Sequence, residues 1–279
     1  MLLKLHVLHF NHKLRPEADH EQNFVKSLAE HYKIPFHYKT AKHLKPGQAG
    51  LQETARQWRI EESIKMLKKV EADCIATGHH ADDQTETLLL KWLRGTHISN
   101  LQGMLWKNPP FIRPLLNCRK KELMQYLKSN NFSWMEDSTN LSSTYLRNRV
   151  RIELIPLLNE LTREGLDSRI GDLNEQSSLF REWLDREYEE WRIAARNTES
   201  MNDYKISLDD LDKANRLLQE EIIYKFITTK TNIELSYKNL RNIFELLNSE
   251  NKYWEYTLSE EWKLVNSGNE LSLQNKPKS

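Results

Sequence analysis

Apolar residues in the first half of the chain follow two alternating patterns. Short apolar runs, typical of buried strands, occupy residues 4–10, 35–40, 72–77 and 111–116. Between these runs the apolar positions recur at helical spacing, which predicts helices over residues 21–32, 51–69, 81–93 and 120–129. Because strands that alternate with helices form parallel sheets covered on both faces, we predict an α/β fold with a doubly wound, mainly parallel sheet. This domain is predicted to span residues 1–155.

The second half of the chain has a different pattern. Helical spacing of apolar residues predicts three long amphipathic helices, over residues 167–197, 215–229 and 236–249. Residues 253–273 follow the pattern of two strands that turn at Asn266, Ser267, Gly268 and Asn269. We therefore predict a second, mainly helical domain over residues 165–279.

The composition is that of a water-soluble chain. Its 279 residues have a mean hydropathy of −0.75, and 29% of them are charged. No apolar run approaches the roughly 18 residues of a spanning helix. Histidines interrupt the apolar residues of segment 1–15, so that segment lacks the apolar stretch of a signal peptide. We expect no membrane association and a cytoplasmic location.

The two cysteines, Cys74 and Cys118, lie far apart in the sequence, and neither belongs to a C-x-x-C pair. A disulfide framework or a zinc site built mainly from cysteine is therefore not expected. We predict two reduced, buried thiols.

Charge is spread unevenly along a chain whose net charge is only +1. Residues 111–151 contain eight basic residues against three acidic ones, and residues 167–190 are acidic overall. A local basic region in a nearly neutral protein suits a partner that touches one defined face.

Segment 77–87 (TGHHADDQTET) is the strongest candidate for chemistry. It lies where a predicted buried strand turns into a helix, and ligands of open α/β sheets bind outside the carboxyl ends of strands. Gly78 allows a close turn, and His79 and His80 follow it. Asp83 and Glu86 share one helix face because they are three residues apart. These groups could hold Mg²⁺ on a triphosphate or orient a reacting base; the alternative is that the acids only complement the helix dipole. A zinc site would need a further ligand.

Two groups of arginines are candidates for binding phosphate. Arg56 and Arg59 form a polar helix stripe with Gln52, which would otherwise be a solvated face. The segment Arg147, Arg149 and Arg151 precedes Pro156 and could be a plain basic stretch. Arginine has a planar fork of donors that suits phosphate, which favours contact with a tRNA or with a transition state. The tryptophans fit packing better than base stacking, and we assign none of them a function.

Segment 77–87 resembles the adenylating-domain motif of the ATP pyrophosphatase group of tRNA-modifying enzymes. Further segments resemble the tRNA(Ile)-lysidine synthetases of that group, in the same order along the chain. They are residues 9–15 (HFNHKLR), 51–59 (LQETARQWR), 93–95 (LRG), 101–104 (LQGM), 136–140 (EDSTN) and 147–151 (RNRVR). The resemblance is close from residue 5 to about residue 160, and looser beyond.

This resemblance implies an adenine-nucleotide alpha hydrolase-like fold and a ligase reaction. ATP would adenylate the C2 oxygen of the wobble cytidine of an isoleucine tRNA, and free L-lysine would then displace AMP. The implied cofactors are ATP and Mg²⁺, and a homodimer is left open.

The resemblance also implies roles for particular residues. Asp83 and Glu86 would handle magnesium or the lysine amine. His79 or His80 would contact nucleotide or base, and Arg147 and Arg149 would stabilise developing charge. The implied nucleotide contacts are Asn11, His12 and Gly78, and the implied tRNA contacts are Arg56, Arg59, Arg94, Arg119, Lys120 and Arg151.

One motif of the family is not found in the 279 residues, namely the Ser-Gly-Gly-x-Asp-Ser loop that binds the ATP phosphates. The chain opens at what would be the family's second strand, so the first strand, the loop and a helix, roughly 25–30 residues in such a unit, are not found. We therefore expect the chain as given to be inactive and poorly stable. Two alternatives are a tRNA thiolation enzyme of the same fold and an inactive tRNA-binding relic. Thiolation enzymes typically use cysteine pairs, and Cys74 and Cys118 do not form one.

Overall fold

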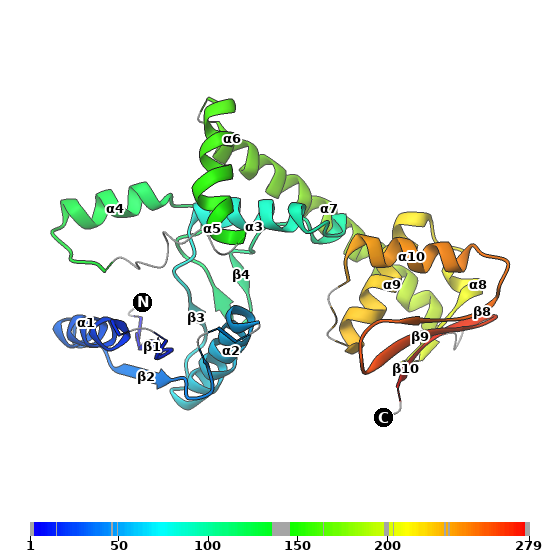
Figure 1. Cartoon of the computed structure of the whole chain (residues 1–279), viewed down its shortest axis with the longest axis horizontal. Helices are drawn as coiled ribbons and strands as arrows, with labels where there is room; N and C mark the ends of the chain where they lie inside the picture. Colours follow the sequence, from blue (N-terminus) through cyan, green and yellow to red (C-terminus); the bar gives the residue numbers. More distant parts are fainter. Residues whose placement is uncertain are drawn as a thin grey trace. The chain divides into compact units, whose positions relative to one another are not determined.

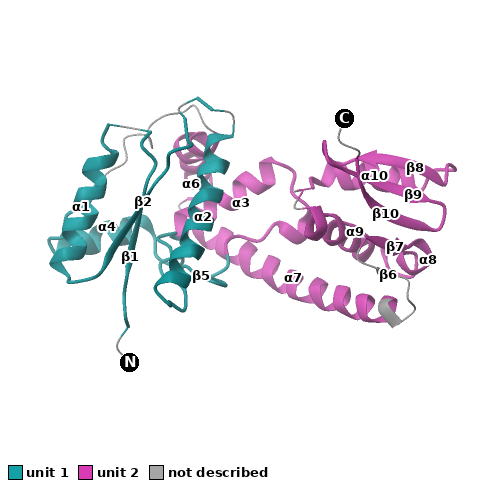
Figure 2. Ribbon diagram, turned by 90° about the horizontal axis from the view of Figure 1, so that it is seen from below, with its two compact units in different colours: residues 1–80, 105–138 teal, residues 81–104, 139–279 magenta. Residues whose placement is uncertain are grey.

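The computed structural model describes residues 3–14, 16–45, 47–48, 50–135, 146–163, 165–197, 201–202, 204–231, 233 and 235–276. The family-like segment 136–140 and Arg15 lie outside the described residues. The chain forms two compact units (Figure 2). Unit 1 comprises Met1–His80 and Leu105–Ser138, and unit 2 comprises Ala81–Met104 and Thr139–Ser279. The predicted domains, residues 1–155 and 165–279, are divided differently from these two units and stay a prediction.

Unit 1 begins with a strand–helix–strand segment. β1 (Val7–Asn11) and β2 (Phe36–Thr40) pair in parallel, and α1 (Ala18–His31) connects them (Figure 1). α1 buries Ala18 and Ala29 and has acidic residues in its first turn, where they complement the helix dipole. This agrees with the prediction of a parallel α/β arrangement.

The rest of unit 1 consists of α2 (Leu51–Lys69), β3 (Ile75–Ala76), β4 (Lys107–Asn108), β5 (Phe111–Ile112) and α4 (Lys120–Ser129). These three strands form one sheet in the order β3-β5-β4, with β3 and β5 parallel. In the described part of the chain, β1–β2 and β3-β5-β4 are two hydrogen-bonded sheets and not one. The strands are shorter than predicted, and β5 ends before Pro114, which has no N–H for the ladder.

The shortening of β3 also changes the environment of a cysteine. Cys74 and Cys118 are both free thiols, as predicted, but Cys74 is exposed and Cys118 is half-buried. The prediction of buried thiols was therefore wrong for Cys74. Cys74 precedes the paired residues of β3, so the sheet does not cover it.

Unit 2 begins with helices. α3 (Ala81–Leu93) is followed by a 3₁₀ turn η1 (Ile98–Asn100), and after the insertion of unit 1 residues the chain continues through α5 (Leu146–Arg149), a π-helical turn η3 (Val150–Leu154), α6 (Ile155–Leu161) and α7 (Leu166–Asn197). Among the residues that the structure describes, no helix has the length and apolar character that crossing a membrane requires.

The C-terminal part of unit 2 combines helices with a sheet. Its helices are α8 (Leu208–Leu211), α9 (Arg216–Thr231) and α10 (Tyr237–Leu247), and its strands are β6 (Met201–Asn202), β7 (Lys205–Ser207), β8 (Tyr253–Thr257), β9 (Trp262–Ser267) and β10 (Glu270–Asn275). They form one antiparallel sheet in the order β6-β7-β10-β9-β8. The sequence predicted two strands over residues 253–273, but the structure has three there, β8, β9 and β10, and β6 and β7 extend the same sheet.

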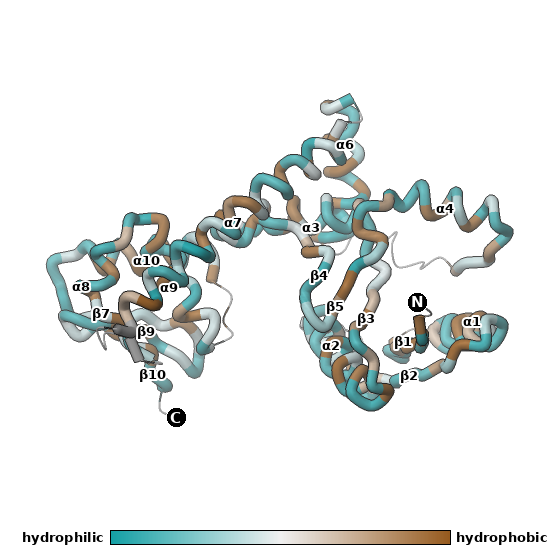
Figure 3. The backbone as a smooth tube through the Cα atoms, turned by 180° about the vertical axis from the view of Figure 1, so that it is seen from behind, coloured by the Kyte–Doolittle hydropathy of each residue, from teal (hydrophilic) through white to brown (hydrophobic). Residues whose placement is uncertain are grey.

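A single hydrophobic core lies between α7, α9, α10 and this sheet, and hydrophobic segments are visible along α9 and α10 in Figure 3. Ile222, Ile223, Leu240 and Leu264 are among its fully buried residues. The turn between β9 and β10 lies where predicted, and Gly268 has a φ of 98° there, a left-handed conformation that favours glycine.

Candidate active site

The candidate residues of segment 77–87 fall on both sides of a unit boundary, between His80 and Ala81. In unit 1, the Thr77 backbone N–H donates to the Ile112 carbonyl at 3.0 Å, which extends the parallel pairing of β3 and β5. The Thr77 hydroxyl lies 2.9 Å from Nδ1 of His79, and both His79 and His80 are half-buried. The histidines are thus held at the carboxyl end of β3, where ligands bind in open α/β sheets.

The structure does not require glycine at position 78 for its own packing. Gly78 is exposed, its φ is not in the left-handed region, and an added Cβ would meet no atom within 4 Å. A tight turn was predicted to need glycine here, but the backbone conformation and the space at residue 78 would also accept other residues. Open space at this backbone is compatible with the predicted nucleotide contact, which stays a prediction.

In unit 2, Glu86 of α3 is a buried carboxylate clamped by two arginines. Its residue is only 1% exposed. Arg147 donates from Nε to Oε2 at 2.8 Å, and Arg151 donates from Nε to Oε1 at 2.5 Å and from Nη2 to Oε2 at 3.0 Å. The hydrogen bond to Glu86 raises the pKa of Arg151. A buried carboxylate is tolerated only when it is paired and hydrogen-bonded in this way.

Arg147 also reaches the second acid of the motif. Its Nη2 lies 3.4 Å from Oδ1 of Asp83, so one guanidinium joins Asp83 and Glu86, as their i, i+3 spacing on α3 allows. With Arg151 included, two cations face two carboxylates. The side chain of Arg147 remains 43% exposed, which leaves part of its fork open to a ligand.

Arg149 does not share this cluster. It forms an exposed i, i+4 ion pair with Glu153, at 3.0 Å from Nη2 to Oε2. The sequence grouped Arg147 with Arg149 and assigned Arg151 to tRNA; the structure instead pairs Arg147 with Arg151 on Glu86. The functional roles of all three stay predictions.

Magnesium was predicted on Asp83 and Glu86. Both oxygens of Glu86 already accept from guanidinium groups, and the described residues contain no group of three or more His, Cys, Asp or Glu side chains placed to hold a metal ion. In this structure Glu86 therefore holds Arg147 and Arg151 in place. The magnesium site stays a prediction.

Asn11, a predicted nucleotide contact at the end of β1, is fully engaged within unit 1. It is 1% exposed, and its amide donates to Asp19 at 2.8 Å and to Gln22 at 3.0 Å, while its oxygen accepts from the Lys13 backbone at 2.9 Å. These bonds tie the end of β1 to the start of α1. Asn11 therefore has a structural role beside any role toward a nucleotide.

His12 packs against Trp58 of α2, with ring centroids 5.4 Å apart and the rings edge to face. Phe10 and His43 contact the same indole. Trp58 is thus a packing residue, as the sequence favoured for the tryptophans, and it places His12 beside α2.

The predicted tRNA contacts are all at the surface or partly so. Arg56 and Arg59 are exposed on α2; Arg56 pairs with Glu53 at 3.0 Å. Arg119 and Lys120 are exposed at the start of α4, where the Arg119 backbone N–H donates to Glu122 at 2.7 Å. Arg94 is exposed in unit 2.

Segment 101–104 connects helices within unit 2. Gln84 of α3 donates to the Met104 carbonyl at 2.8 Å, and the Gly103 N–H donates to Asn174 of α7 at 2.6 Å. An added Cβ at Gly103 would collide with the Gln84 amide and lie 2.8 Å from Asn174 Oδ1. A side chain at residue 103 would therefore displace these two amide side chains and disturb their hydrogen bonds to the Met104 and Gly103 backbone.

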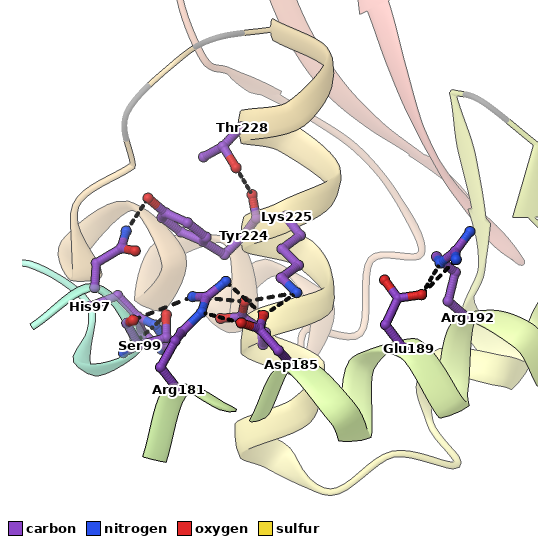
Figure 4. Close-up of polar contacts among 11 residues, drawn as sticks. His97, Ser99, Arg181, Asp185, Glu189, Arg192, Tyr224, Lys225 and Thr228 are labelled. Atoms are coloured by element: carbon purple, nitrogen blue, oxygen red, sulfur yellow. Dashed lines mark hydrogen bonds and ion pairs between the residues drawn. The ribbon is translucent and has the colours of Figure 1, made fainter. Parts of the chain in front are cut away.

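Sequence reasoning missed a second charged cluster in unit 2, and Figure 4 shows its part around Arg181, Asp185 and Lys225. His97 is buried, and Nδ1 accepts from the Ser99 N–H, so Nε2 donates to Glu220 at 3.1 Å. Burial would raise the pKa of Glu220, but hydrogen bonds from His97 and Arg216 lower it. His97 and Glu220 lie 123 residues apart, and no local pattern in the sequence predicts that they pair.

The same cluster joins α7 to α9. Arg181 lies 2.9 Å from Asp185 and 3.2 Å from the fully buried Glu221, and Lys225 lies 2.6 Å from Asp185 (Figure 4). Arg181 also donates to the Ser99 carbonyl at 3.3 Å. These contacts fix the η1 turn to the helices of the C-terminal core.

The first half of the chain matches a known protein family. The profile of the PP-loop domain family matches residues 1–158. The chain is 29% identical to a tRNA(Ile)-lysidine synthase of Enterococcus faecalis over 98% of this chain and 60% of that protein. It is 32% identical to one of Petrotoga mobilis, over 68% of this chain and 62% of that one, and 28% identical to one of Nostoc sp., over 89% and 76%.

A solved structure shares the fold. The U34-tRNA thiolase NcsA from Methanococcus maripaludis with its [4Fe-4S] cluster superposes with a TM-score of 0.51 at 15% identity, over 63% of this chain and 60% of that one. The chain spans about 60% of the Enterococcus and Petrotoga relatives and about 40% of several others. The predicted resemblance to lysidine synthetases and the predicted fold class are confirmed: the chain belongs to the PP-loop domain family.

Proposed function

We propose that this chain carries out its part of tRNA(Ile)-lysidine synthesis, an ATP-dependent ligation of L-lysine to the wobble cytidine of isoleucine tRNA. One observation carries the proposal: Arg147 and Arg151 of one family-like segment close on Asp83 and Glu86 of another, across 61 to 65 residues. Relatives named tRNA(Ile)-lysidine synthase support the choice of reaction.

The proposed reaction has two displacements. The cytidine C2 oxygen attacks the α-phosphorus of ATP, an O–P bond forms and pyrophosphate leaves. The lysine amine then attacks C2, an N–C bond forms, the C–O bond breaks and AMP leaves with its electron pair. The amine loses a proton during this step, and a side chain at the site must accept it.

The residues of the chain fit parts of this chemistry. The partly exposed Arg147 is fixed by two carboxylates, so its cationic fork is preorganised for negative charge that develops on phosphate. His79 and Asp83 are the proposed proton acceptors for the amine. PP-loop membership implies use of ATP, and the open surface at Gly78 offers backbone for its approach. Asp83 is the acid that would help to hold magnesium on the ATP phosphates, since both oxygens of Glu86 accept from arginines.

The phosphates of ATP also need donors. The 279 residues contain no Ser-Gly-Gly-x-Asp-Ser segment, whose backbone N–H groups would cradle them. We therefore infer that turnover requires such a segment in addition to these residues.

The test compares two proteins: the 279-residue chain, and the same chain with the phosphate-binding segment of a lysidine synthase relative fused in front. Each is incubated with isoleucine tRNA, ATP and labelled lysine. We expect label in tRNA from the fusion alone. Label from the unfused chain would refute the need for the segment, and sulfur incorporation or unmodified tRNA from a folded fusion would refute the assignment.

A further inference from the structure

The long helix α7 has a side that the C-terminal core does not use, although the helix runs uninterrupted along unit 2 (Figure 2). The opposite side is anchored, because Leu184 is fully buried in the core and Ala195 is only 3% exposed. The unused side carries five exposed residues, which we call the α7 stripe: Leu179, Trp183, Arg186, Glu190 and Ile193.

The spacing of the α7 stripe is that of a helix that pairs with another helix. Successive members are four, three, four and three residues apart, which is the pattern of a two-helix seam and keeps them on one face. Leu179 is 60% exposed, and Ile193 is 57% exposed. Trp183 contacts Phe180, whose ring centroid is 5.8 Å away and which packs against the core. The seam thus has a firmly placed aromatic residue and an apolar residue at each end.

Two opposite charges occupy the middle of the α7 stripe. Arg186 and Glu190 are exposed, and neither forms an ion pair with another residue whose side chain the structure describes. An arginine four residues before a glutamate is also the less favourable order for a pair within one helix. Charges at the centre of an apolar seam need opposite charges across it, so the matching helix presents a glutamate and an arginine in the reverse direction.

A second copy of α7 that runs antiparallel presents its charges in that direction. Suppose that a two-fold axis passes level with residue 188. Arg186 then lies opposite the partner's Glu190, and Trp183 lies opposite the partner's Ile193, because the members of each pair are equally far from residue 188 along the helix. The α7 stripe is therefore complementary to itself.

The length of the helix agrees with this arrangement. Leu179, the first member of the α7 stripe, would lie level with residue 197 of the second copy, where α7 ends. The overlap of the two helices would therefore take in the whole stripe and little else of α7.

Two other occupants fit the charges less well. A parallel pair of helices would set Arg186 against the partner's Arg186 and Glu190 against the partner's Glu190, and these like charges would repel. Nucleic acid is disfavoured because residues 167–190 are acidic overall, which repels a phosphate backbone.

We propose that two copies of this chain associate through the α7 stripe, with their α7 helices antiparallel about a two-fold axis level with residue 188. The interface is isologous, so each substitution in it removes two contacts. This proposal does not rest on the proposed function.

The first test measures the dimer dissociation constant of the 279-residue chain by sedimentation equilibrium. Trp183→Ala should raise this constant about tenfold or more, because a tryptophan at the centre of an interface contributes strongly to binding. Matched controls on α7 are Leu173→Ala and Arg169→Glu, at exposed positions that precede the overlap, and neither should change the constant.

The second test reverses the charges of the α7 stripe. Arg186→Glu should dissociate the dimer, because the new carboxylate faces the partner's Glu190, and Glu190→Arg should do the same through facing arginines. An equimolar mixture of these two variants should form a heterodimer. The chain with both substitutions should form a homodimer again.

Three results would overturn the proposal. A parent chain that sediments as a monomer at its highest soluble concentration would leave the α7 stripe to a different partner. A dimer that survives Trp183→Ala and both charge reversals, in variants that melt like the parent chain, would place the contact elsewhere. A mixture of the two charge-reversed variants that stays monomeric would exclude the pairing of Arg186 with Glu190. The substituted positions are exposed, so the variants should keep the fold of the parent chain.

Discussion

Unit 1 and the C-terminal core of unit 2 differ in how deeply they bury their side chains. Leu184, Ile222 and Leu264 of unit 2 are 0% exposed, whereas the most deeply buried apolar residue in the described part of unit 1 is Ala29, at 3%. The largest apolar residues buried in unit 1, such as Met66 at 8%, stay partly accessible. Because burial of apolar surface is the main source of stability, the C-terminal core should dominate the stability of this chain.

This difference in burial corresponds to a difference in role, with ligand binding proposed for unit 1 and structural support for the C-terminal core. The unit with the small core contains Gly78, His79 and His80 of the candidate site. Ligand-binding regions belong to the less stable parts of proteins, since they must admit their ligands. The large core holds α7 and α9 together through the Arg181 and Asp185 cluster, and so supports the η1 turn that follows α3.

The largest effect is expected from the large core. Leu264→Ala removes a fully buried side chain of β9 and should lower the free energy of unfolding by about 2–5 kcal/mol, from lost transfer energy and the cavity that remains. Urea denaturation checks this. Leu161→Ala, at a position that is 70% exposed, is the control and should change it by less than about 0.5 kcal/mol. Equal effects of the two substitutions would contradict the assignment of the core.

A smaller effect is expected at the arginine clamp. Glu86→Gln leaves two guanidinium groups without their shared carboxylate and should destabilise the chain by about 1–3 kcal/mol, reduced from the fully buried case because both arginines are partly exposed. Asp83→Ala removes the 3.4 Å contact with the partly exposed Arg147 and should cost less than about 1 kcal/mol.

Both substitutions should abolish lysine transfer by the fused enzyme, the first through displaced arginines and the second through loss of a proposed proton acceptor. A folded Asp83→Ala enzyme with nearly normal turnover would show that Asp83 only complements the helix dipole.

The smallest effect on the free energy of unfolding is expected from lowering the pH. The pKa of Glu220 is lowered in the folded chain, so its contribution is present above its unfolded pKa of about 4.3 and is lost as pH falls through the lower folded value. The loss should be about 1 kcal/mol, the net value of its hydrogen bonds. Unfolding free energies measured between pH 6 and roughly pH 3 check this. Glu220→Gln should flatten the dependence, and an unchanged slope would assign the acid sensitivity elsewhere.

The sequence predicted the elements whose signals are local. Helices over residues 51–69, 81–93 and 120–129 have the predicted bounds, because apolar spacing and turn residues specify them without help from distant segments. β7 was missed because its three residues form a strand only through pairing with β10, for example Ile206 with Leu271. That pairing is long-range, and nothing within the segment encodes it.

The candidate site shows the same limit. The i, i+3 spacing placed Asp83 and Glu86 on one face correctly, but it could not say that Arg147 and Arg151 would occupy Glu86 or that Arg149 would pair with Glu153.

The most direct test of the account is the mass of the nucleosides from isoleucine tRNA after incubation with ATP, lysine and the fused enzyme. We predict a cytidine that has gained lysine with loss of one water, formed by the parent fusion and not by its Asp83→Ala variant. A cytidine or uridine that has exchanged oxygen for sulfur, or tRNA that remains unmodified by a well-folded fusion, would contradict the proposed function.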